Sequence, residues 1–138
     1  MKLGREAIAG LVPHQGAMCL LEEVEDWNEH AIACRARSHR DAANPLRTAG
    51  RLAAIIGVEY AAQAVAVHGG LTGNVPRTGY LAAVRDLECA VERLDTVVED
   101  LTIHATQVAA EGVRLLYDFR IVAGGRELLR GRLTVVYK

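Results

Sequence analysis

The longest apolar run in the chain, Leu52–His68, contains two strongly polar side chains before its end, Glu59 and Gln63. The run predicts a fully buried helix that stops at Gly69-Gly70, because glycine commonly follows the last turn of a helix. A helix that is apolar nearly all round must be enclosed by other elements.

Beyond residue 79 the pattern changes to a period of two. Apolar side chains take every second position in 101–105 and in 113–121, and Gly124-Gly125 is a hairpin signal before the last strand. A short helix is predicted over 2–10, and 38–51 is predicted to be a long loop. The predicted strands span about residues 18–26, 30–37, 80–91, 96–110, 113–121 and 128–137.

This order predicts an α+β protein with one domain over residues 1–138. Two strands, one long apolar helix and an antiparallel meander follow one another, and a curved sheet wrapped around the helix is the simplest way to bury it. The arrangement is the hotdog fold, with an antiparallel sheet of five to six strands around one long buried helix. The exposed edge strand of such a sheet favours dimerisation.

The amino-acid composition argues against several classes of protein. Of the 138 residues 51% are hydrophobic, which excludes disorder, and a formal charge of −1 gives no reason to expect nucleic acid or an anionic membrane as a partner. Three cysteines without CxxC spacing favour reduced thiols in a cytoplasm over disulfides or zinc. The run Leu52–His68 is predicted to be too short, and too interrupted by Glu59 and Gln63, for a membrane span, so we expect a cytoplasmic protein.

Glu59 is the first candidate for chemistry. Carboxylates are rarely buried without a partner or a function, since removing the charged form from water is costly. Either Glu59 belongs to a site, or it is a structural group bonded to Tyr60, Gln63 or an arginine.

Four segments carry a resemblance to a known family. Leu11–Val24 is similar to a Leu-Pro-His opening followed by an apolar strand, and Gly57–Gln63 is similar to a Glu-Ala-Met-Ala-Gln helix motif. Tyr80–Asp86 and Gly131–Val135 fit later strands. Together they resemble the 3-hydroxyacyl-acyl-carrier-protein dehydratases of fatty acid synthesis and the thioester dehydrase-like proteins of polyene pathways.

The resemblance implies a reaction that removes water from a 3-hydroxyacyl thioester. It also implies a dimer in which a loop histidine and a helix carboxylate come from opposite subunits. Glu59 matches the carboxylate, Gln63 lies one turn on and can hold its geometry, and Ala54 takes the position whose N–H binds the thioester carbonyl. The substrate would be carried on the phosphopantetheine of an acyl carrier protein or on CoA, and no metal or other cofactor is expected.

The chain departs from this family at the catalytic histidine, whose position is occupied by Pro45. His39 lies six residues upstream and reaches inward only if the loop is rerouted, and His14 matches a histidine that is not the family's base. We therefore take Glu59, His14 and His39 as catalytic candidates. Substrate binding is assigned to Ala54, Gln63 and Asn44, of which Asn44 could orient a thioester but could not remove its proton.

Three functions remain open. The protein could be an active dehydratase with a relocated histidine, a non-catalytic hotdog subunit that pairs with an active dehydratase, or an acyl-thioester hydrolase that uses Glu59. A homodimer and a heterodimer are both compatible with the sequence. Arginines around the long loop are either a solvated rim or a docking patch for an acidic carrier protein and its phosphopantetheine phosphate, namely Arg35, Arg37, Arg40, Arg47 and Arg51.

Overall fold

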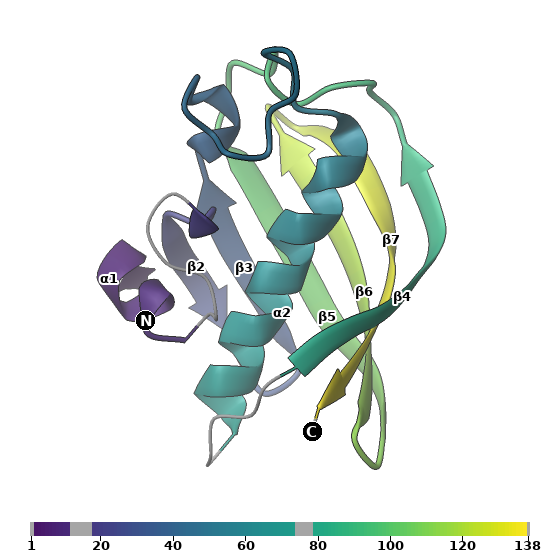
Figure 1. Cartoon of the computed structure of the whole chain (residues 1–138). Helices are drawn as coiled ribbons and strands as arrows, with labels where there is room; N and C mark the ends of the chain where they lie inside the picture. Colours follow the sequence, from purple (N-terminus) through teal and green to yellow (C-terminus); the bar gives the residue numbers. More distant parts are fainter. Residues whose placement is uncertain (1, 12–17, 74–78, 138) are drawn as a thin grey trace.

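The computed structural model describes residues 2–11, 18–73 and 79–137, in which one antiparallel sheet curves around one long helix (Figure 1). The helices are α1 (Arg5–Ala9), η2 (Ser38–Arg40), η3 (Ala54–Ile56) and α2 (Gly57–Thr72). The strands are β1 (Leu3–Gly4), β2 (Glu23–Trp27), β3 (Ala31–Ala36), β4 (Gly79–Cys89), β5 (Leu101–Glu111), β6 (Arg114–Ala123) and β7 (Arg126–Tyr137).

The sheet order is β1-β2-β3-β5-β6-β7-β4, and every neighbouring pair is antiparallel. This is the predicted wrap, with seven strands rather than five to six. The additional strand is the two-residue β1, which pairs Leu3 with Val24 in the segment predicted to be helical. Only the later part of that segment forms a helix, α1.

The core lies between α2 and the inner face of the sheet. Tyr60, Ala64 and Val65 of α2 are fully buried, as are Ile103 on β5 and Leu133 on β7. The alternation of buried and less buried positions along β5 follows the period of two that predicted this strand. The small alanine side chains on α2 let the helix pack closely against the sheet.

The prediction that α2 stops at Gly69-Gly70 was wrong, because the helix continues to Thr72. A Cβ added to Gly69 would lie 2.6 Å from the Tyr137 hydroxyl oxygen, and one added to Gly70 would lie 2.8 Å from Leu11. The glycines therefore permit close packing inside the helix rather than ending it.

The helical stretch Ala54–Thr72 is 19 residues long and apolar enough to cross a membrane by length and composition alone. The expectation that this region is too short was thus wrong about its length. However, 56% of the most apolar window is buried inside the structure, and the stretch packs against the sheet as a core helix.

Two strand boundaries also differ from the prediction. The apolar residues Cys19–Leu21 are buried but lie before β2, which begins at Glu23. β5 begins at Leu101 rather than at residue 96, because carbonyl groups of the preceding residues bond to a buried histidine side chain, as described below. Side-chain hydrogen bonds, which leave no periodic signal in a sequence, replace strand pairing in both segments.

Candidate functional site

Glu59 lies on a partly exposed stripe of α2. The stripe consists of Ile56, Glu59, Ala62, Ala66 and Gly69, spaced three or four residues apart and all intermediate in burial. Within the part of the chain that the structure describes, no hydrogen bond or ion pair reaches the Glu59 carboxylate. The expectation of full burial was wrong, and neither Tyr60 nor Gln63 is bonded to this carboxylate.

Both polar atoms of the Gln63 side chain form hydrogen bonds with the backbone of residues 18–20. Its Oε1 accepts a hydrogen bond from the Leu20 N–H at 2.9 Å, and its Nε2 donates to the Met18 carbonyl at 2.6 Å. The Gln63 side chain is 3% exposed. These two bonds resemble those between neighbouring strands, because the amide accepts from one backbone group and donates to another. They fix residues 18–20 against α2. The predicted substrate-binding role is therefore replaced by a structural one.

Replacing Gln63 with leucine is expected to lower the free energy of unfolding by about 2–4 kcal/mol, because the Leu20 N–H and Met18 carbonyl would lose their partners inside the protein. Urea titration of the variant measures this loss. Gln107→Leu is the matched control, since Gln107 accepts only one long contact, 3.4 Å, from the Tyr117 hydroxyl. Equal small losses in both variants would contradict the assigned role.

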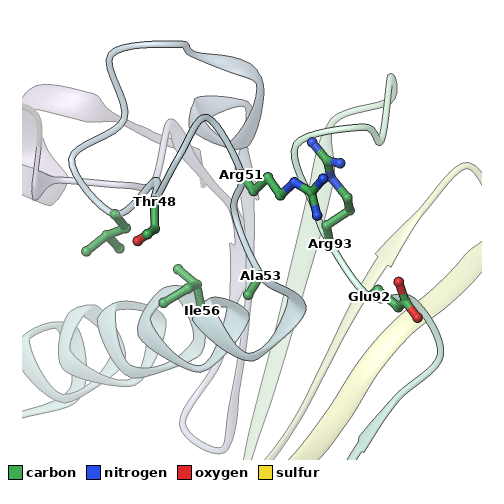
Figure 2. Close-up of a pocket in the computed structure, with 7 residues that line it drawn as sticks. Thr48, Arg51, Ala53, Ile56, Glu92 and Arg93 are labelled. Carbon is green, nitrogen blue, oxygen red and sulfur yellow. The ribbon is translucent and has the colours of Figure 1, made fainter.

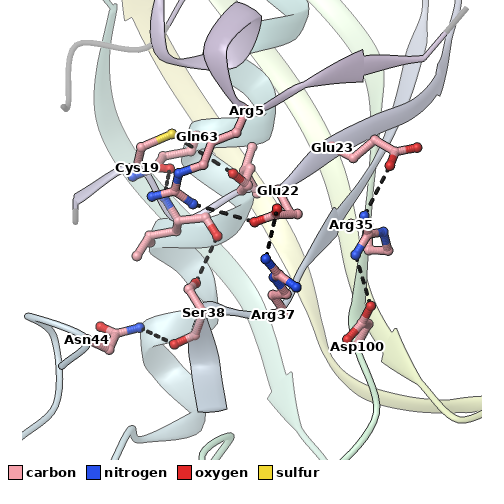
Figure 3. A network of polar contacts seen from close by, with 12 residues as sticks. Arg5, Cys19, Glu22, Glu23, Arg35, Arg37, Ser38, Asn44, Gln63 and Asp100 are labelled. Atoms are coloured by element: carbon pink, nitrogen blue, oxygen red, sulfur yellow. Dashed lines mark hydrogen bonds and ion pairs between the residues drawn. The ribbon is translucent and has the colours of Figure 1, made fainter. Parts of the chain in front are cut away.

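Asn44 and Tyr60 belong to one buried network between the long loop and α2. Asn44 Nδ2 donates to the Ser38 carbonyl at 2.9 Å and to the Tyr60 hydroxyl at 3.2 Å, while its Oδ1 accepts from the Leu46 N–H at 2.9 Å. Ser38 Oγ lies 2.8 Å from the Tyr60 hydroxyl, and burial raises the pKa of Tyr60. Figure 3 shows the bond between Asn44 and Ser38. Asn44 holds the loop in place and has no free group for a thioester.

His39, a catalytic candidate, is fully buried. Its Nε2 lies 3.1 Å from the Val97 carbonyl oxygen and 2.9 Å from that of Glu99, so Nε2–H donates to both. Burial, followed by the nearby Arg40 charge, lowers the pKa of His39 and favours the neutral ring. The bonded edge of the ring faces the segment before β5, and His39 does not pair with Glu59.

The other expected histidine, His14, lies outside the described residues. Pro45, at the family's histidine position, is exposed. His68, at the far end of α2, is a buried core residue whose Nδ1 lies 2.6 Å from the Tyr117 hydroxyl and whose Nε2 lies 2.8 Å from the Asn28 carbonyl. Among the described residues, therefore, no histidine contacts the Glu59 carboxylate.

Ala54 is buried at the start of η3, and its N–H already has an acceptor. It donates to the Glu92 carbonyl at 3.0 Å, while the Leu94 N–H donates to the Leu52 carbonyl at 2.7 Å. Residues 52–54 and 92–94 are thus held together by backbone bonds. The proposed bond from Ala54 N–H to a thioester carbonyl is incompatible with this arrangement.

A pocket of about 310 Å³ opens at the beginning of α2. Figure 2 shows the side chains around it, which come from the long loop, from η3 and from the segment after β4. The lining residues are Leu46, Thr48, Arg51, Ala53, Ile56, Glu92 and Arg93. Sequence reasoning missed Thr48 and Arg93, because no spacing motif connects the two segments.

Most of the arginines proposed as a carrier-protein patch are neutralised within the chain. Arg35 bonds to Glu23 at 3.1 Å and to Asp100 at 3.0 Å, and Figure 3 shows this chain of three charges. Arg37 pairs with Glu22 at 3.4 Å, and Arg40 pairs with Asp100. A continuous basic patch is therefore not formed by these residues.

Arg51 differs from those arginines. It lines the pocket at the start of α2, and its side chain makes no hydrogen bond or ion pair with any residue in the described ranges. Within those ranges, no cluster of three metal-ligating side chains occurs.

The outer strand β4 pairs only with β7 among the described strands, and it exposes apolar side chains. Leu81 and Val84 lie opposite Val135 and Leu133, which belong to the core, yet they are 39% and 37% exposed. Tyr137, paired with Gly79 at the start of β4, also approaches Gly69 on the α2 stripe. The stripe on α2 therefore approaches the β4–β7 pair at Tyr137, and β4 itself leaves an open sheet edge among the described strands.

Residues 6–138 match the sequence model of the ApeP-like family, which is described as ApeP dehydratase. No curated protein matches the sequence significantly.

Solved structures with the same fold include dehydratases and thioesterases. The dehydratase heterocomplex ApeI:P from Xenorhabdus doucetiae matches with a TM-score of 0.84 and 24% identity, over 99% of this chain and 91% of that chain. A thioesterase from Haemophilus influenzae matches with a TM-score of 0.71 and 15% identity, over 99% and 91% of the two chains. A mutant thioesterase from Pseudomonas aeruginosa matches with a TM-score of 0.60 and 15% identity, over 85% and 80%. These likenesses confirm the predicted hotdog fold.

Proposed function

The chain belongs to the ApeP-like dehydratase family, and from this membership we propose that it is one subunit of a heteromeric 3-hydroxyacyl-thioester dehydratase. It would provide Glu59, while a related hotdog subunit would provide the histidine whose position in this chain is occupied by Pro45. Heteromeric pairing is supported by the similarity to the dehydratase heterocomplex ApeI:P.

The proposal rests on the burial, bonding and location of Glu59. A carboxylate that is half-buried, unbonded within the described chain and located on a stripe beside an open sheet edge suits a site completed by another subunit. His39 is bonded elsewhere and Pro45 cannot titrate, which argues against a self-sufficient dehydratase that uses His39 as its base.

In the proposed reaction, the partner's histidine removes the proton from the carbon next to the thioester carbonyl. Protonated Glu59 donates its proton to the 3-hydroxyl group, the bond between that oxygen and carbon breaks, and water leaves as the carbon–carbon double bond forms. Negative charge that develops on the thioester oxygen is favoured near the start of η3 and α2, where the helix dipole is positive.

Such a heterodimer would contain one complete site. Glu59 and the partner's histidine form one pair, whereas Pro45 takes the histidine's position in the reciprocal site. We therefore expect half as many active sites as subunits. Acyl-carrier-protein or CoA thioesters of fatty acid or polyene-type biosynthesis are the proposed substrates, without a metal or other cofactor, in the cytoplasm.

The test is to express the chain alone and together with a histidine-bearing hotdog dehydratase from the same genome. We expect no 2-enoyl product from 3-hydroxyacyl thioesters with the chain alone, and product from a copurified heterodimer. Product formation by the chain alone, or failure to form any complex with such a dehydratase, would refute the proposal. Release of free thiol instead of an enoyl product would identify the hydrolase alternative.

A further inference from the structure

The unpaired Arg51 is presented to the pocket by a tight turn. Thr48 and Arg51 exchange backbone hydrogen bonds, 2.8 Å from the Thr48 N–H and 3.0 Å from the Arg51 N–H. The two residues between them, Ala49 and Gly50, have φ values of 52° and 73°. Positive φ at both central positions is the pattern of a type I′ turn, which closes a two-residue hairpin. Thr48 and Arg51 consequently leave the turn side by side, and both line the pocket.

The side chain of Arg47 holds this turn in place through two hydrogen bonds. Arg47 Nη1 donates to the Gly50 carbonyl at 2.9 Å, and Arg47 Nη2 donates to the His39 carbonyl at 3.0 Å. Ala49 is a non-glycine residue in a left-handed conformation, which is unfavourable unless the surroundings impose it. A braced, strained turn therefore keeps Arg51 in a fixed place at the mouth of the pocket.

Arg93 meets Arg51 from the opposite wall. The Arg93 guanidinium is held by Asp95, through Nε at 3.0 Å and through Nη2, and Asp95 Oδ1 also accepts the Leu52 N–H at 2.9 Å. In Figure 2 the guanidinium groups of Arg51 and Arg93 point toward one another, whereas Glu92 is directed away from them. Asp95 already accepts hydrogen bonds from Arg93 and from the Leu52 N–H. Its negative charge therefore compensates only part of the positive charge of Arg51 and Arg93.

We propose that Arg51 and Arg93 bind the phosphate of the thioester's carrier arm, as found in CoA and in phosphopantetheine. Guanidinium groups bind phosphate through paired charge-assisted hydrogen bonds, and two that face each other can hold one anion between them. The assignment names the carrier site of the dehydratase proposed above and rests on that function.

The other residues that line the pocket indicate how the carrier arm of the thioester would be directed. Leu46, Ala53 and Ile56 provide apolar contacts beside the polar end, and the volume of about 310 Å³ is at the lower end of ligand pockets. Ile56 and Glu59 are three residues apart on the same stripe of helix, which places the carboxylate about one turn beyond the pocket. A phosphate at Arg51 would direct the arm along this side of the helix, toward Glu59.

The test compares two thioesters of the same 3-hydroxyacyl group, one on CoA and one on N-acetylcysteamine, which has no phosphate. In the heterodimer, Arg51→Gln is expected to raise KM for the CoA thioester about 10- to 100-fold, since a charge-assisted bond contributes about 1.5–3 kcal/mol. The KM for the N-acetylcysteamine thioester and the kcat for both should not change. Arg114→Gln is the matched control and should leave all values unchanged, because Arg114 begins β6 at the β5–β6 hairpin, which lies at the end of the sheet away from the start of α2 (Figure 1).

A direct measurement separates this proposal from the proposed reaction. CoA binding to the purified heterodimer, measured by calorimetry, is expected to weaken by the same factor in Arg51→Gln even if no dehydration is observed. Unchanged CoA affinity would overturn the phosphate site. Equal effects on both thioesters, or loss of the partner subunit from the variant, would overturn it too, since Arg51 would then serve the reaction centre or the subunit interface.

Discussion

Replacing Glu59 with glutamine is expected to lower kcat for dehydration by the heterodimer about 10²- to 10⁴-fold, the range that a positioned acid or base contributes. The amide has nearly the same shape but cannot donate a proton to the departing hydroxyl. Stability should change by less than about 0.5 kcal/mol, because Glu59 is partly exposed and has no partner in the described chain. Single-turnover measurements of enoyl product and urea titration provide the two values.

The experiment requires a heterodimer purified through a separate tag on each subunit, since a homodimer of the partner could form product by itself. Glu111→Gln, an exposed carboxylate at the end of β5, is the matched control and should retain full kcat. Full activity in Glu59→Gln would exclude a chemical role for this residue. A large loss of stability would instead identify Glu59 as a structural carboxylate.

The elements of this protein were predictable where a repeating pattern specifies them. The run Leu52–His68 predicted α2, and the alternation in 113–121 predicted β6, because the helix and strand periods determine which side chains reach the core. The edge strand was also expected, and β4 confirms it. The predicted stop at Gly69-Gly70 failed because glycine serves close packing as well as helix ends.

The site was less predictable because its contacts join distant segments. Nothing in the local sequence indicates that Gln63 bonds to residues 18–20, or that His39 bonds to carbonyls beyond residue 96. The burial of Glu59 was misjudged for a related reason. An apolar helix surface has the same sequence pattern whether it faces its own sheet or a second subunit, and only the fold distinguishes the two.

The basic residues illustrate the same limit. Five arginines near the long loop look alike in the sequence, yet three of them pair with acidic side chains and Arg47 braces a turn. Arg51 is the one arginine of these five whose side chain has no bonded partner, backbone or side chain, in the described ranges. Charge counts therefore suggested a broad docking patch, whereas the geometry supports a small anion site near α2.

Replacing Val84 with glutamate is expected to weaken association with the partner subunit about 100-fold or more. Val84 lies on the only long unpaired edge among the described strands and is 37% exposed, so a subunit that pairs with β4 would cover it. A carboxylate enclosed there without a partner would lose its hydration, and a 100-fold change in Kd corresponds to about 2.7 kcal/mol. Titration of tagged partner subunit measures the Kd.

Val108→Glu is the matched control, because Val108 on β5 is 45% exposed but lies away from the β4 edge in the sheet order. It should leave the Kd unchanged. Urea titration of both isolated variants shows whether the fold itself has been weakened, which matters because Val84 lies opposite the core residue Leu133. If Val84→Glu binds the partner as tightly as the unmodified chain, β4 is not the pairing edge. The active site around Glu59 must then be completed across another surface.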